Sequence, residues 1–81
     1  MVTIERAQTG VRIEKRMLKV LKALAEHLDL SLGELLECMV LHAFDGKAVF
    51  GEVTLAKIEK LKSVYDLDLN SADAHALEEP A

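Results

Sequence analysis

The chain of 81 residues is 51% hydrophobic and 4% aromatic, and its 10 basic and 14 acidic side chains give a formal net charge of -4. This apolar content excludes an intrinsically disordered chain, and the single cysteine excludes a disulfide framework. Because a domain of this length buries only about 60% of the surface of its unfolded chain, we expect it to gain stability by self-association.

The first 13 residues lack a helical period and alternate between two kinds of side chain. One parity is mostly apolar and the other mostly polar or charged: Ala7, Thr9, Val11 and Ile13 against Arg6, Gln8, Gly10 and Arg12. This period of two predicts a β-strand with one buried face. No second strand-like run follows, and a lone strand leaves its backbone hydrogen-bonding groups unpaired. We therefore expect it to pair with the same strand of a second copy.

Residues 14–28 change to a helical period, with basic side chains outside the apolar stripe. The stripe recurs at three- and four-residue spacing: Met17, Leu21, Leu24 and Leu28. After a short break at Asp29-Leu30, Ser31 is followed three residues later by Glu34. A Ser and a Glu at this spacing form a capping box, in which each side chain accepts a hydrogen bond from the other residue's backbone N–H. We expect a second helix to begin here.

The second helix is expected over 32–44 and should end at Asp45-Gly46, where glycine suits a left-handed cap. It is apolar on nearly every side: Leu32, Leu35, Leu36, Met39, Val40, Ala43 and Phe44 form a broad stripe, outside which lie Cys38 and Leu41. A helix that is apolar all round must be covered all round. We expect it at the centre of a dimer core. The alternative is a compact monomer in which 47–81 folds over its second face.

The rest of the chain predicts one further helix and a tail. Val49 and Phe50, in a short connector, are expected to dock onto the core, and Thr54 is the predicted N-cap of a third helix that runs to about Tyr65. We expect the last ten residues to form a weak helix or a frayed tail. The fold class is therefore mainly α with one short strand. The chain divides into a dimerisation and binding part, 1–46, and a helical extension with an acidic tail, 47–81.

This order of strand, basic helix, tight turn and capped apolar helix resembles the ribbon-helix-helix family, the fold of the Met and Arc repressors. Three stretches within residues 6–44 carry the resemblance: Gln8-Thr9-Gly10-Val11-Arg12-Ile13, Met17-Leu18 through Leu24-Ala25-Glu26, and Ser31-Leu32-Gly33-Glu34-Leu35-Leu36. The sequence departs from the family pattern at Glu14, where proline often opens the first helix, at Asp29, where glycine is frequent, and at Gly33, where a small polar residue is frequent. The resemblance implies a homodimer whose two antiparallel strands enter the major groove of DNA as a ribbon.

The resemblance also implies roles for individual side chains. Bases would be contacted from the exposed face of the strand by Arg6, Gln8 and Arg12. Phosphates would be contacted by Lys15, Arg16, Lys19, Ser31 and Gly33. The dimer core would hold Val11, Ile13, Leu21, Leu24, Leu35, Leu36, Met39, Val40 and Phe44. For each charged or polar position the plainer alternative is a solvated surface group, and for Ser31 it is a helix cap alone.

Charge is divided unevenly along the chain. Residues 1–28 hold six basic and three acidic side chains, a sum of +3, and residues 29–81 hold four and eleven, a sum of -7. The expected function is a homodimeric DNA-binding transcriptional regulator, a repressor by its resemblance. The alternative is an acidic dimer that acts as a protein-interaction module without strong DNA binding. A composite, antitoxin-like protein would bind DNA with its first half and a protein partner through 47–81.

Other chemistry is only weakly signalled. Cys38 and His42 lie four residues apart, but no third ligand lies nearby, so no metal site is predicted. The sequence has no glycine-rich phosphate loop, no nucleophile with a recognisable base and no cofactor motif, so we do not expect an enzyme. No apolar run approaches the roughly 20 residues of a membrane span. A lone thiol suits a reducing compartment, and we expect a cytoplasmic protein.

Overall fold

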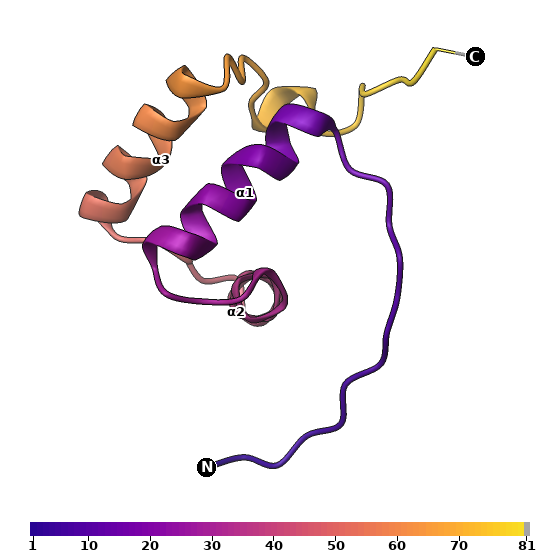
Figure 1. Ribbon diagram of the computed structural model, residues 1–81, viewed down its shortest axis with the longest axis vertical. Helices are drawn as coiled ribbons and strands as arrows, with labels where there is room; N and C mark the ends of the chain where they lie inside the picture. The colour runs from indigo at the N-terminus through magenta and orange to yellow at the C-terminus, as the bar shows by residue number, and fades with distance from the viewer. Residues whose placement is uncertain (81) are drawn as a thin grey trace.

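Three α-helices of 13 residues each form the body of the protein in this computed structural model, which describes residues 1–80. Helix α1 spans Lys15–His27, α2 spans Leu32–Phe44 and α3 spans Glu52–Val64, and a single 3-10 turn follows at Ser71–Asp73. Both other helices pack against α1. Helix α3 lies alongside it, and α2 crosses near its C-terminal end (Figure 1).

Helix α1 begins at a cap made by a carboxylate. Oε1 of Glu14 accepts a hydrogen bond from the backbone N–H of Met17 at 3.0 Å, and Oε2 accepts one from the N–H of Arg16 at 3.1 Å. These bonds satisfy amide groups that the first turn of a helix leaves without partners. They also lower the pKa of Glu14, and the N–H of Arg16 is the largest cause.

Helices α1 and α2 both end with a residue in the left-handed region. Asp29 has φ 56° after α1, and the N–H of Leu30 then donates to the carbonyl of Ala25 at 2.9 Å. Gly46 has φ 66° after α2, and the N–H of the next residue donates to the carbonyl of His42 at 2.9 Å. Such bonds satisfy the last carbonyls of a helix. The predicted left-handed glycine is confirmed.

Helix α2 begins at the predicted capping box. Oγ of Ser31 accepts a hydrogen bond from the N–H of Glu34 at 3.1 Å, and Oε1 of Glu34 accepts one from the N–H of Ser31 at 3.0 Å. The predicted bounds of this helix, 32–44, are also confirmed. Both bonds lie within one turn, so the local sequence contains everything that they need.

The core is small and centres on α1. Leu24 and Ala25 of α1 and Leu35 of α2 are buried against one another, and Leu35 is 0% exposed. Half-buried apolar side chains from the helices and from both connections pack around them: Leu21, Leu28, Leu30, Met39, Phe50, Ile58 and Leu61. The expected docking of Phe50 onto the core is confirmed, whereas Val49 is half-buried but is not among the side chains packed against the core.

The predicted N-terminal strand is absent, and the ribbon-helix-helix fold is wrong. Residues 1–80 form three α-helices and no strand. Residues 1–13, the N-terminal arm, are instead an extended segment that leaves α1 and runs outside the helical body (Figure 1). Alternating side chains favour extended backbone, but a strand also needs a hydrogen-bonded neighbour, and the described part of the chain provides none. The predicted apolar face is not buried either, because Val11 is exposed and Ile13 is only half-buried.

Helix α3 begins two residues before the predicted cap. Its N-cap is Gly51, which makes no side-chain hydrogen bond, and Thr54 lies inside the helix. The predicted Thr54 cap is therefore wrong; an acidic residue in the first turn, Glu52, favours the helix start through the helix dipole instead. Helix α3 packs against the core through Ile58 and Leu61. Among residues 1–80 no helix combines the length and the apolar character needed to cross a membrane.

Candidate interaction surfaces

Three lysines form a row on the exposed side of α1. Lys15, Lys19 and Lys22, the lysine row, are separated by four and three residues, which places them on one side of the helix. The buried Val20 and Leu24 lie on the opposite side. None of the ion pairs formed within residues 1–80 involves these lysines. Sequence reasoning missed Lys22, although its spacing from Lys19 was the signal that could have found it.

The N-terminal arm carries the side chains predicted to contact bases. The guanidinium of Arg6 forks onto Glu37 of α2: Nε donates to Oε2 at 2.8 Å and Nη2 donates to Oε1 at 3.0 Å. This hydrogen bonding is the largest cause of the lowered pKa of Glu37. Arg12 pairs with Glu79 near the C-terminus, and Gln8 is exposed. All three side chains thus lie on an exposed segment, with carboxylates on the two guanidinium groups.

Arg16 bridges two parts of the fold. Its guanidinium donates to Oε2 of Glu14 at 3.2 Å, to the carbonyl of Asp66 at 2.9 Å and to Oδ1 of Asp68 at 2.9 Å. These bonds tie the start of α1 to the segment that follows α3. A phosphate contact at Arg16 would require several of them to break, so we leave Arg16 out of any proposed interface.

A carboxylate lies beside the two residues at the start of α2 that were predicted to contact phosphate. Ser31 and Gly33 are exposed there, but Glu34 of the capping box lies at the same helix end. Its pKa is lowered, mainly because it accepts the backbone N–H of Ser31. A carboxylate that already occupies this amide repels a phosphate, and we leave this helix end out of the proposed interface as well.

Helix α2 turns an apolar side away from the core. Glu37, Val40, Leu41 and Phe44, the α2 outer face, follow the spacing that brings side chains to one side of a helix. Val40 is 44% exposed, Leu41 64% and Phe44 82%. The alternative in which 47–81 covers this side is not observed, because α3 packs on α1. Leu41, which was expected to lie outside the apolar stripe of this helix, belongs to the exposed α2 outer face.

The residues predicted for a dimer core fall into two groups. Those that are buried or half-buried within the single chain are Leu24, Leu35, Leu21, Met39, Leu36 and Ile13. Those that are exposed are Val11, Val40 and Phe44. Only the exposed group is free to meet another molecule.

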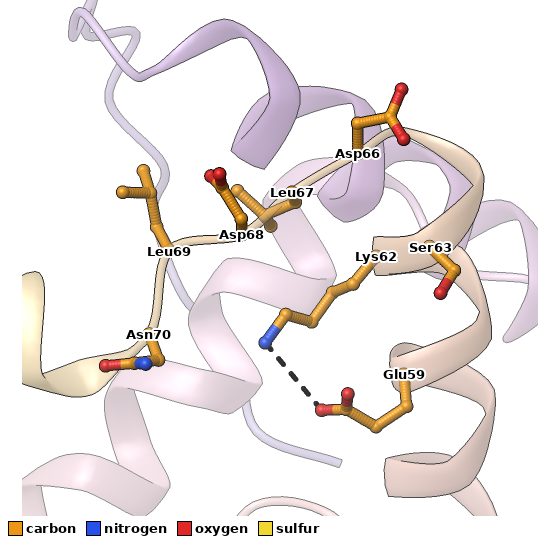
Figure 2. A pocket seen from close by; sticks show the side chains of 8 residues that line it. All are labelled: Glu59, Lys62, Ser63, Asp66, Leu67, Asp68, Leu69 and Asn70. Atoms are coloured by element: carbon orange, nitrogen blue, oxygen red, sulfur yellow. Dashed lines mark ion pairs between the residues drawn. The ribbon is translucent and has the colours of Figure 1, made fainter.

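An open pocket of about 440 Å³ lies between the end of α3 and residues 66–70 (Figure 2). In it, Nζ of Lys62 points toward Glu59 at 3.7 Å. Asp68 also lines the pocket, but its carboxylate is bound to Arg16. Because these charged side chains are already paired, we assign no function to this pocket.

Cys38 and His42 lie close together on α2. Nδ1 of His42 is 3.7 Å from Sγ of Cys38 and 2.7 Å from the carbonyl oxygen of Cys38. A ring nitrogen this close to a carbonyl carries a proton and donates it, so it is not free to take the proton of the thiol. Within residues 1–80 no group of three His, Cys, Asp or Glu side chains could hold a metal ion.

Any function has to be inferred from the exposed surfaces of this chain. No protein-family model, curated protein or solved structure matches the chain. The lysine row and the N-terminal arm adjoin each other, because the arm leads directly into α1. The α2 outer face is chemically different, since it is apolar apart from one carboxylate.

Proposed function

We propose that this protein binds double-stranded DNA as a transcriptional regulator, with the lysine row on the phosphate backbone and the N-terminal arm in a groove. The observation that supports the proposal is the lysine row, whose residues are exposed and form no ion pair within residues 1–80, in a chain of net charge -4. Seven residues of helix separate Lys15 from Lys22, about 10 Å along the axis. Each strand of duplex DNA carries one charge in about every 3.4 Å of the helix axis, so about three phosphates of one strand span this distance and can meet all three lysines.

The arm supplies the part of the proposed contact that reads sequence. It is extended and exposed, and Arg12 lies three residues before the lysine row begins. Extended basic arms can enter a DNA groove as single segments, so this contact does not need a paired ribbon. The guanidinium groups of Arg6 and Arg12 suit guanine, and the amide of Gln8 suits adenine.

The carboxylates on Arg6 and Arg12 do not oppose this proposal strongly. Both ion pairs are exposed, and exposed pairs contribute little to stability and are screened by salt. A phosphate oxygen can take the place of a carboxylate oxygen at the same guanidinium. The net charge is negative, but residues 1–28, which hold both surfaces, sum to +3.

The test is a titration of labelled duplex DNA at several salt concentrations, read by fluorescence anisotropy. We expect binding at low salt that weakens as salt rises. In the variant with Lys15, Lys19 and Lys22 changed to alanine, the slope of log affinity against log salt should become shallower by about 2.7, or about 0.9 for each lost phosphate contact.

A matched control separates local charge from total charge. The variant with Lys47, Lys57 and Lys60 changed to alanine removes the same three charges from other parts of the chain. We expect its salt slope to stay close to that of the unchanged protein. The proposal fails if the unchanged protein shows no affinity for DNA at low salt, or if both variants lose affinity equally.

A second candidate function is a protein-interaction module that uses α3. This helix exposes Val53, at 87%, and Val64 on one side and Leu55 on another, while Ile58 and Leu61 pack on the core. Its test compares the unchanged chain with a Val53→Asp, Val64→Asp variant as bait in a pull-down. A partner that binds through α3 should be retained by the first bait and lost with the second. Retention by both baits contradicts this second candidate.

A further inference from the structure

The α2 outer face continues by one more turn toward the start of the helix. Gly33 precedes Glu37 by four residues, so positions 33, 37, 40 and 44 follow one another at spacings of four, three and four. This is the spacing of a coiled-coil seam, in which each position meets a second helix. The opposite side of α2 is already occupied, because Leu35 and Met39 face the core.

The protein exposes more surface than a compact monomer of its mass. Its accessible surface is 7079 Å², whereas about 4,800 Å² is expected at 8.9 kDa. The difference of about 2,300 Å² exceeds the ~800 Å² that each partner buries in a standard interface. The N-terminal arm and residues 74–80, which are exposed almost throughout, account for much of this excess. The α2 outer face adds contiguous apolar side chains of the kind found in the centre of interfaces.

Nothing within the single chain explains why position 33 is a glycine. A Cβ built on it would meet only Oγ of Ser31, at 3.9 Å, and its φ is not in the left-handed region. The fold therefore does not require glycine here, although glycine has a lower helix propensity than alanine. An empty position within a helix surface allows another side chain to come close.

We propose that two copies of this chain pair through antiparallel α2 helices, with Phe44 of each copy seated over Gly33 of the other. In this register the most exposed and bulky side chain of the face meets the position that has no side chain. Val40 then lies opposite Glu37 of the second copy. A parallel pairing would instead place Phe44 against Phe44 and Gly33 against Gly33, so the ring would not meet the position that has no side chain.

The single charge of the face fits this arrangement. In the protein without DNA, Glu37 is paired with Arg6 from the N-terminal arm, so the face has no net charge to repel its copy. A two-fold symmetric contact needs a surface that is complementary to itself. The α2 outer face meets this condition, because it offers both the projecting ring and the space that receives it.

The experiment measures solution mass without DNA, so its result is independent of the DNA-binding proposal. Sedimentation equilibrium of the full chain from about 1 µM to about 200 µM should show the mass rise from 8.9 kDa toward twice that value. Phe44→Ala should raise the dimer dissociation constant about tenfold or more, with helical content unchanged because Phe44 is outside the core. Val53→Ala, an equally exposed apolar change on α3, should leave the dissociation constant unchanged.

Gly33 provides the test of register. Gly33→Leu fills the space without a clash inside the single chain, and we expect it to abolish the dimer while the helical content is kept or raised. The exchange variant, Gly33→Phe with Phe44→Gly, moves the ring and the space to each other's positions and should restore the dimer. A chain that stays at 8.9 kDa throughout, or a dimer indifferent to Phe44→Ala, overturns the inference. An exchange variant that remains monomeric overturns the antiparallel register.

Discussion

At the scale of single residues, backbone strain is concentrated in two aspartates. Asp29 and Asp66 have φ values of 56° and 54°, in the left-handed region that disfavours side chains with a Cβ. Each follows a helix directly, where glycine adopts the same conformation without steric cost. The sequence departs from glycine at Asp29 and still makes the same turn, so the turn is held by the helices on either side of it.

This strain leads to a stability prediction. Asp29→Gly should raise the free energy of unfolding by about 1 kcal/mol, because glycine removes the left-handed penalty. Urea denaturation with an unchanged m-value would measure it. Asp45→Gly is the matched control: Asp45 has an ordinary right-handed backbone at φ -84°, so the same change there should lower stability. Equal effects at the two sites would contradict the explanation.

At the scale of elements, the sequence predicted what local hydrogen bonds decide. The capping box of Ser31 and Glu34 and the left-handed Gly46 were correct because their partners lie within one turn. The strand was wrong: alternation of side chains favours extended backbone, but the hydrogen bonds of a strand were expected from a second copy of the chain, and no local signal in residues 1–13 supplies them. The α3 cap was also wrong, since Thr54 offers a hydroxyl but the helix starts at a residue without one.

Three hydrogen-bonded carboxylates, two in helix caps and one paired with Arg6, make the stability of the fold sensitive to acid. The pKa values of Glu14, Glu34 and Glu37 lie below the ordinary 4.5, because each accepts hydrogen bonds in the folded chain. A carboxyl with a lowered folded pKa contributes stability that is complete above its unfolded pKa and is lost as the pH falls through the folded value. The urea midpoint should therefore decline below about pH 4.5.

A pair of glutamine variants tests this acid dependence. Glu14→Gln removes a capping carboxylate and should make the decline in the urea midpoint shallower. Glu78→Gln removes an exposed carboxylate that caps no helix and should leave the decline unchanged. If both variants retain the acid profile of the unchanged protein, the capping bonds do not cause the decline.

At the scale of the whole molecule, the candidate surfaces could be predicted only in part. The excess of basic residues before position 28 and the apolar character of α2 are visible in the sequence. The partners of the arginines are not, because Glu37, Asp68 and Glu79 lie 31, 52 and 67 residues from Arg6, Arg16 and Arg12. The division of α2 into a buried and an exposed side also depends on where α3 packs, and periodicity does not determine that.

The packing of both other helices on α1 determines how the single chain unfolds locally. Both α2 and α3 rest on α1, and neither rests closely on the other, so one of them can detach while the other stays docked. Backbone amides in the middle of α1 should consequently exchange their hydrogen with deuterated water most slowly. Those of α2 and α3 should exchange sooner, through separate partial openings that require less free energy than global unfolding.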